Sequence, residues 1–483
     1  MSVSISVLRH AQIAMIVVIA ACLASCSSEP LEPWHTARLS QEFDRNATDE
    51  IRTYADYLAL EDRLFEELEN DVYSKVGTGP EFALFRYSKG SLADPSVRSP
   101  NYNRTFELTP EDPRGNVLLL HGMSDSPYSL HDIGQVLYEH GYRVIGLRLP
   151  GHGTAPSGLR SLRWEDMAAA MRLAIEHLES TGAKLPLHLF GYSTGAGLAL
   201  DHAFNALEDT TLTMPDSLVL ISPAIGITPF AALAGTKATI GKLPGFAGAA
   251  YASVIPEFDP YKYNSFATNA GAQVHKLTQS NTRRLDRVVR AGKADALPPM
   301  LVFKSTVDAT VSNQAVVDRL LGVLPENGNE LVLFDINRAA AISSILVDDP
   351  GPFTNRLMGE QMQPFGVTLI TTVNNETRDV VARYKPAGSS DTTRSETLAM
   401  AWPQGVISLS HVALPFAPED PLYGQYRPAD PNVLFLGQTE IRGERGLLKI
   451  STDFLLRLRY NPFYDVLKSR ALEWLDEVVA ERP

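Results

Sequence analysis

Short, continuous apolar runs recur along the chain and alternate with stretches in which apolar residues recur at helical spacing. A continuous run of this kind suits a β-strand that is covered on both faces. Strands that alternate with helices predict a mostly parallel sheet flanked by helices, that is, an α/β fold. The predicted strands are residues 115–122, 143–149, 185–192, 217–221, 300–304 and 330–336.

Residues 49–76 form a helical pattern of a different kind, in which spaced apolar residues lie among many acids. The pattern predicts a helix that either packs on the domain or stands off a membrane. Its apolar positions include Ile51, Tyr54, Leu58, Phe65 and Leu68.

The N-terminus has the pattern of an export signal. Arg9 precedes an apolar run over residues 11–23 that is short for a membrane span. The run ends in Leu-Ala-Ser-Cys at residues 23–26, which resembles the lipobox of bacterial lipoproteins. This resemblance implies a signal peptide over residues 1–25, acylation of Cys26, and a membrane-anchored protein that faces the periplasm or the cell exterior. Cys22 also fits the box loosely, and a signal peptide without lipidation is the other alternative.

Composition adds two expectations. The two cysteines are Cys22 and Cys26, so the mature domain is expected to contain no disulfide. The 483 residues carry a net charge of −13, and the basic residues do not cluster, so no nucleic-acid partner is expected.

The pattern Gly-x-Ser-x-Gly spans Gly191, Ser193 and Gly195. An apolar run enters it and a run rich in Ala and Leu leaves it, so Ser193 is predicted to lie where a strand turns sharply into a helix. Such a turn strains the serine backbone, and glycines on either side avoid clashes of a Cβ atom. Ser193 is therefore the candidate nucleophile.

Together with His121-Gly122 and with Pro-Gly-His-Gly at residues 150–153, this turn resembles the α/β-hydrolase family. The narrower resemblance is to its monoacylglycerol lipase and serine aminopeptidase branch, and it covers about residues 116–318 and a segment around His411. It implies an α/β-hydrolase fold.

The resemblance also divides the chain. Residues 26–110 are expected to form a tether and an N-terminal helical or extended segment, and residues 111–483 the hydrolase domain. A helical cap is expected at about 223–297. A second insertion, at about 338–404, precedes the histidine and departs from the family pattern.

In this fold the catalytic residues follow the chain order Ser, Asp or Glu, His. His411 is the sole histidine after residue 275, and it ends a strand-like run. Asp308 follows the apolar strand 300–304 and is the preferred acid, with Asp335 and Asp349 as rivals. The predicted triad is Ser193, His411 and Asp308.

Two backbone N–H groups are expected to stabilise the oxyanion, one from Thr194 and one from Met123. His121 and His152 are expected to shape their loops rather than to transfer protons. No cofactor is expected, and no metal site is predicted, because the histidines and acids lack ligand spacing.

The leading functional hypothesis is a serine hydrolase that cleaves carboxylic esters, with a small monoacylglycerol-like or medium-chain acyl substrate. An aminopeptidase is the first alternative, with Glu257 and Asp259 as candidates to hold a substrate amine. A non-catalytic lipoprotein that binds an apolar ligand is the second, and it would be favoured if His411 could not reach Ser193. Candidates for an acyl pocket are Phe230, Leu233, Phe246, Tyr251, Tyr261 and Phe266.

Overall fold

The computed structural model describes residues 30–47, 50–180, 184–226, 250–308, 311–340, 346, 349–430, 432–437 and 457–480. Cys22, Cys26 and the predicted signal segment lie outside the described residues, as do Phe230, Leu233 and Phe246. Among the described residues, no helix combines the length and apolarity needed to cross a bilayer.

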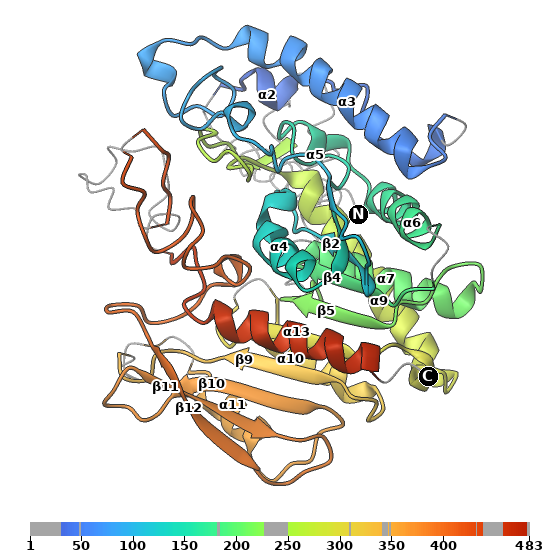
Figure 1. Cartoon of the computed structure of the whole chain (residues 1–483), viewed down its shortest axis with the longest axis vertical. Coiled ribbons are helices and arrows are strands. Elements are labelled where there is room, and N and C mark those ends of the chain that lie inside the picture. Colours follow the sequence, from blue (N-terminus) through green and yellow to red (C-terminus); the bar gives the residue numbers. More distant parts are fainter. Residues whose placement is uncertain are drawn as a thin grey trace, which may run out of the picture.

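A ten-stranded sheet in the order β1-β3-β2-β4-β5-β8-β9-β10-β11-β12 forms the centre of the molecule (Figure 1). The strands from β3 to β10 in this order run parallel, whereas β1, β11 and β12 are antiparallel to their neighbours. The predicted mostly parallel α/β sheet is thus confirmed. Its strands are β1 (Phe106–Leu108), β2 (Gly115–Leu120), β3 (Tyr142–Leu147), β4 (Leu187–Tyr192), β5 (Ser217–Ile221), β8 (Met300–Ser305), β9 (Glu330–Phe334), β10 (Gly366–Thr372), β11 (Asp379–Lys385) and β12 (Arg394–Ala401).

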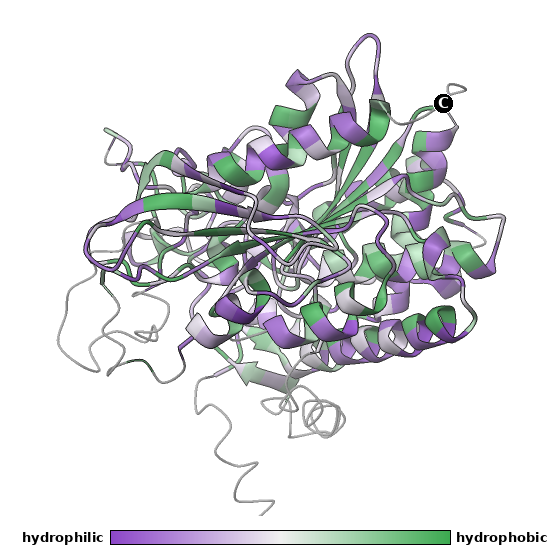
Figure 2. Ribbon diagram, turned by 90° about the horizontal axis from the view of Figure 1, so that it is seen from below, coloured by the Kyte–Doolittle hydropathy of each residue, from purple (hydrophilic) through white to green (hydrophobic). Residues whose placement is uncertain are grey.

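Helices cover both faces because successive side chains of each buried strand point to opposite sides of the sheet. On β2, Leu118 and Leu120 join the apolar core on one face, and Val117 and Leu119 join the core on the other. In Figure 2 the strands are mainly hydrophobic, while the helices carry both hydrophobic and hydrophilic residues. The first face is covered by α6 (Trp164–Glu179), α7 (Thr194–Glu208), α9 (Thr268–Arg290), α10 (Asn313–Arg319) and α11 (Gly351–Met358), and the second by α4 (His131–Glu139) and α13 (Tyr464–Ala480).

The segment expected to form a helical cap divides into parts. Residues 227–249 lie outside the described residues, and residues 250–267 contain a small two-stranded sheet, β6 (Tyr251–Ser253) with β7 (Phe266–Ala267). The long helix α9 packs against α7, and its Leu277 and Leu285 belong to the apolar core under the sheet. This part of the predicted cap is therefore a layer of the main α/β domain itself, because its apolar side chains are buried against α7.

The predicted insertion at 338–404 extends the main sheet instead of forming a separate excursion. Strand β10 pairs in parallel with β9, and β11 and β12 continue the sheet antiparallel, at the opposite end of the molecule from α3 (Tyr54–Asp71) in Figure 1. The buried Asn337 closes this extension, because its backbone N–H donates to Ile407 O at 2.8 Å and its side-chain amide donates to Val406 O at 2.8 Å. The chain thereby returns to the end of β9.

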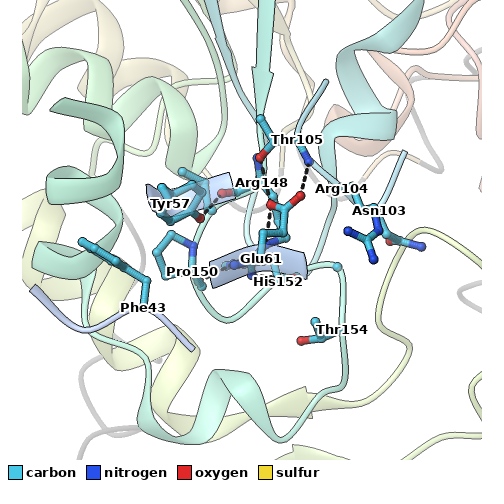
Figure 3. A network of polar contacts seen from close by, with 12 residues as sticks. Phe43, Tyr57, Glu61, Asn103, Arg104, Thr105, Arg148, Pro150, His152 and Thr154 are labelled. Carbon is cyan, nitrogen blue, oxygen red and sulfur yellow. Dashed lines mark hydrogen bonds and ion pairs between the residues drawn. The ribbon is translucent and has the colours of Figure 1, made fainter. Parts of the chain in front are cut away.

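The predicted N-terminal helix is α3, and it packs on the domain. Thr53 and Asp56 form a reciprocal capping box at its start. Its Tyr57 hydroxyl donates to Arg148 O at 2.6 Å, and the buried Arg148 Nε donates to Glu61 Oε2 at 2.9 Å (Figure 3). The α3 helix is thus fixed to the loop after β3 by a buried charge pair.

The other contacts of Arg148 complete this network. Its guanidinium also reaches Glu42 at 3.1 Å and His152 O at 3.1 Å, while Glu61 accepts hydrogen bonds from the backbone and hydroxyl of Thr105. The guanidinium is fully buried, so its charge requires a carboxylate partner, and Glu61 is the more deeply buried of its two partners.

We expect Glu61→Gln to destabilise the protein by about 3 kcal/mol, because it leaves the buried Arg148 with a single carboxylate. The free energy of unfolding from urea titration measures this loss. Asp62→Asn is the matched control, since the Asp62 side chain is 72% exposed and pairs with Arg104 at the surface. The control should lose at most about 1 kcal/mol. Equal losses in the two variants would contradict the importance of the buried pair.

Candidate active site

Ser193 lies at a sharp turn between β4 and α7, as the sequence predicts. Its backbone has φ 53° and ψ −109°, a conformation that costs a non-glycine residue about 1–3 kcal/mol. A Cβ on Gly191 would lie 2.5 Å from Ala196 Cα, and one on Gly195 would lie 1.9 Å from Leu120 O. Both glycines are therefore required for α7 to start directly against the ends of β2 and β4.

The two candidate oxyanion donors belong to the two segments that this close packing brings together. Thr194 is the first residue of α7, and a helix leaves its first N–H groups without intrahelical partners. Met123 follows Gly122, where a Cβ would lie 3.0 Å from the Tyr192 ring. Within the described part of the chain, neither the Thr194 nor the Met123 N–H donates a backbone hydrogen bond. Both amides are therefore available near Ser193.

Asp308 follows β8, and its carboxylate is fully buried. Oδ2 accepts a hydrogen bond from the buried Lys304 ammonium at 2.6 Å, and Oδ1 accepts one from the Val311 N–H at 3.0 Å. Burial alone would raise the pKa of Asp308, but the charges of Lys304 and His411 and the hydrogen bonds of Lys304 and Val311 hold it below its usual value. Asp308 is thus fixed as an anion.

His411 lies beside this anion, with Nδ1 3.5 Å from Asp308 Oδ1. The sequence predicts a strand before the histidine, but the described residues 402–410 are irregular. Two hydrogen bonds from Asn337 hold this segment in place of strand pairing. His411 instead begins a short 3₁₀ turn, His411–Ala413. The predicted acid and base are therefore brought together.

Burial, together with the nearby cations Lys262, Lys304 and Arg457, lowers the pKa of His411 to about 4 against the opposing charge of Asp308. This value lies well below the ordinary histidine pKa of about 6.5.

The rival acids are occupied elsewhere. Arg338 binds Asp335 through Nε and Nη2, at 2.9 Å each, and Asp349 through Nη1 at 2.6 Å. Neither carboxylate is therefore available to orient a histidine.

His121 and His152 have structural hydrogen bonds, as expected. His121 Nε2 accepts the Leu149 N–H at 3.1 Å, so its Nδ1 carries the proton that is donated to Gly122 O at 2.9 Å. His152 Nδ1 lies 3.0 Å from Pro150 O, and burial lowers the pKa of His152 to about 4. Both imidazoles are neutral and fix the loops after β2 and β3.

A small pocket of about 140 Å³ adjoins His411 through Val412. Its wall includes three cationic side chains, those of Lys262, Arg457 and Arg459. Lys262 pairs with Asp125 at 2.5 Å, and Arg459 pairs with Asp259 at 3.1 Å. The remaining lining residues are Asp259, Asn264, Phe416 and Tyr423.

The described candidates for an acyl pocket are core residues. Tyr261 stacks on Tyr128 with ring centroids 4.0 Å apart, the buried Tyr251 donates to His35 O at 2.8 Å, and Phe266 packs against the core under the sheet. None of the three lines the described pocket beside His411.

Sequence reasoning missed two residues that hold the candidate triad. Lys304 interrupts an otherwise apolar buried strand, and that interruption was the available signal, because a buried lysine requires an anionic partner. Asn337 offered no such signal, since its role depends on a backbone segment 69 residues further along the chain.

A serine at this turn and an acid–histidine pair on a mostly parallel sheet define an α/β-hydrolase. The structure has the α/β-hydrolase fold, and residues 111–335 match the family described as serine aminopeptidase, S33. No curated protein matches the sequence.

Several solved structures resemble the chain loosely. One of the metagenome-derived lipolytic enzymes LipS and LipT is 21% identical over 48% of this chain and 87% of its own, with a TM-score of 0.38. The monoacylglycerol lipase of Paleococcus ferrophilus is 19% identical, over 48% and 88%, with a TM-score of 0.36. The monoglyceride lipase of Saccharomyces cerevisiae, solved with a substrate analogue, is 16% identical, over 48% and 82%, with a TM-score of 0.37. At these identities and TM-scores the likeness carries no argument about this chain.

We expect the His411 imidazole to remain neutral down to a pH of about 4, because burial and neighbouring cations oppose its protonation. NMR titration of the folded protein measures this pKa, and the His411 resonance is assigned by its loss in His411→Gln. The protonated fraction should rise only as the pH falls toward that value. A midpoint near the ordinary value of about 6.5 would contradict the described surroundings of His411.

Proposed function

We propose that the protein is a serine hydrolase that cleaves carboxylic esters through Ser193, His411 and Asp308. The observation that carries this proposal is the contact between His411 and the buried Asp308, on the sheet whose strand β4 ends in the strained turn at Ser193. Nδ1 of His411 would donate to Asp308, which leaves Nε2 to accept the proton of the serine hydroxyl. The 3.5 Å separation is long for a hydrogen bond, and we expect it to shorten when substrate is bound.

In the proposed reaction, Ser193 Oγ attacks the ester carbonyl while its proton passes to His411. The N–H groups of Met123 and Thr194 stabilise the negative charge on the carbonyl oxygen, and one such donor is typically worth about 3–4 kcal/mol. His411 then protonates the departing alcohol. A water molecule, deprotonated by His411, hydrolyses the acyl-enzyme and frees Ser193.

We favour an ester over an aminoacyl substrate because the two candidate amine-binding carboxylates are already engaged. Glu257 is buried and accepts the N–H groups of Asn264 and Ser265. Asp259 is buried against Arg459 and accepts the Tyr423 hydroxyl at 2.6 Å. In addition, the cations beside His411 would repel a substrate ammonium. A monoacylglycerol-like or medium-chain ester is the substrate class that we propose.

We favour catalysis over the non-catalytic alternative because the displaced segment returns to the sheet and brings His411 beside Asp308. Asn337 fixes residues 406 and 407, and His411 meets Asp308 a few residues later. A protein that only bound an apolar ligand would not require a strained serine or a buried acid–histidine pair.

We also propose that the protein is exported and anchored through an acylated Cys26. The support is the lipobox-like sequence at residues 23–26 and the short apolar run before it. Stable anchoring would require more than one acyl chain, since a single chain gives only reversible binding.

We expect Ser193→Ala and His411→Ala each to lower kcat on a p-nitrophenyl ester by at least about a thousandfold, because nucleophile and base act as a unit. The double variant should be no slower than either single variant. A fluorophosphonate probe should label the wild type and fail to label Ser193→Ala. His140→Gln, at an exposed histidine, is the control for loss of a histidine and should keep wild-type activity. If His411→Ala keeps full activity, the proposed base is wrong, and faster turnover of aminoacyl amides than of esters would favour the aminopeptidase.

We expect Cys26→Ser to move the protein from the membrane fraction to a soluble or unprocessed form, because the thiol that would carry the lipid is absent. Cell fractionation and metabolic labelling with a fatty-acid analogue measure the change. Cys22→Ser is the matched control and should remain anchored. Continued acylation of Cys26→Ser would show that Cys26 is not the lipidated residue.

A further inference from the structure

Away from the candidate triad, His131, Asp132 and Asp420 bring three potential ligand atoms within 4.8 Å of one another. His131 and Asp132 begin α4, in the chain segment that follows the oxyanion loop. Asp420 lies in the loop that follows His411. No ligand spacing is visible in the sequence because His131 and Asp132 are far from Asp420 in the chain.

Hydrogen bonds orient two of these side chains toward the cluster. His131 Nδ1 lies 2.6 Å from Tyr128 O, and because a carbonyl can only accept, Nδ1 carries the proton and Nε2 faces the cluster. Oδ1 of the buried Asp420 accepts the N–H groups of Leu422 and Tyr423 at 2.8 and 2.6 Å. A histidine held through its other nitrogen is the usual arrangement of a metal ligand.

The remaining oxygen atoms of the cluster are buried without partners. Among the described residues, no hydrogen bond reaches Oδ2 of Asp132 or Oδ2 of Asp420. The hydroxyl of Tyr464, a residue that is only 3% exposed, also has no partner there. Burial raises the pKa of Tyr464, and the charges of Asp132 and Asp420 raise it further. Tyr464 begins α13, which packs against α4. Buried oxygens without partners are costly unless a cation or a proton satisfies them.

Nε2 of His131 lies only 3.3 Å from Asp132 Oδ1. Two acceptors at this distance repel each other unless a positive charge lies between them. That charge is either a proton on His131 or a cation shared by the cluster. A proton would satisfy the His131–Asp132 contact but would leave Asp420 Oδ2 and the Tyr464 hydroxyl unpaired, so the cation accounts for more of the observed arrangement.

We propose that His131, Asp132 and Asp420 bind one divalent transition-metal ion, with Zn²⁺ or Mn²⁺ favoured over Ca²⁺ and Mg²⁺. An imidazole ligand favours the transition metals, whereas Ca²⁺ and Mg²⁺ prefer oxygen ligands throughout. Tyr464, whose buried hydroxyl has no described partner, begins α13, which packs against α4. The ion would join α4 to the loop after His411 and to α13, so its role is structural.

The experiment compares metal binding in the full chain and its Asp132→Asn variant after both have been dialysed against a chelator. Asp132→Asn is the variant that disturbs the fewest contacts, because the described ion pair of that carboxylate is with His131 and its Oδ2 has no described hydrogen bond. Isothermal titration with ZnCl₂ and with MnCl₂ should give a tight site in the wild type that is at least about tenfold weaker in the variant. The melting temperature should rise with either metal in the wild type and remain unchanged in the variant.

Glu419→Gln is the matched control, because Glu419 is an exposed acid next to Asp420, and it should bind metal like the wild type. His131→Gln provides a second loss of a ligand, and circular dichroism checks that each variant is folded. Equal affinity in wild type and Asp132→Asn would overturn the proposal, and so would the absence of a tight Zn²⁺ or Mn²⁺ site in the wild type. Either result would assign the positive charge to a proton on His131. These readouts do not depend on catalysis.

Discussion

The geometry of the site depends on how closely α7 begins against the ends of β2 and β4. This approach leaves no room for a Cβ at Gly191 or Gly195, and it holds Ser193 at a positive φ. The strain is small compared with the core that enforces it, in which α7 is buried almost throughout. The same approach brings the first N–H groups of α7 next to the loop that carries Met123. One packing constraint therefore positions both the serine and its proposed oxyanion donors.

The candidate base reaches the site by a different route. Three further sheet strands separate β9 from His411, and the chain returns only because Asn337 binds residues 406 and 407. Closing a longer loop costs little, about 0.6 kcal/mol per doubling of its length, so the extension is tolerated when its ends are fixed. Beneath the histidine, the Lys304 ammonium compensates part of the charge of Asp308 and keeps the carboxylate oriented.

Local patterns predicted much of this structure. Continuous apolar runs identified the parallel strands because those strands are buried on both faces. Gly-x-Ser-x-Gly identified the turn because the turn leaves no room for a Cβ atom at either glycine. Chain order then led to Asp308 and His411, which do meet. The sheet extension, the place of α9 in the helix layer, and the cluster around Asp420 were not predictable in this way. Each depends on contacts between side chains that are far apart in the sequence, and a local hydrophobic pattern contains no information about such contacts.

The buried guanidinium of Arg148 sets a lower limit on the part of the chain that can fold by itself. The segment that matches the family profile, residues 111–335, contains Arg148 but neither Glu42 nor Glu61. A fragment cut at those limits would lose both carboxylate partners of Arg148 and would expose the part of the core and of α6 that α3 covers. It would also lack α13, which covers the other face of the sheet. A shortened protein for expression should therefore begin before Glu42 and extend through α13, well beyond the boundaries that family similarity suggests.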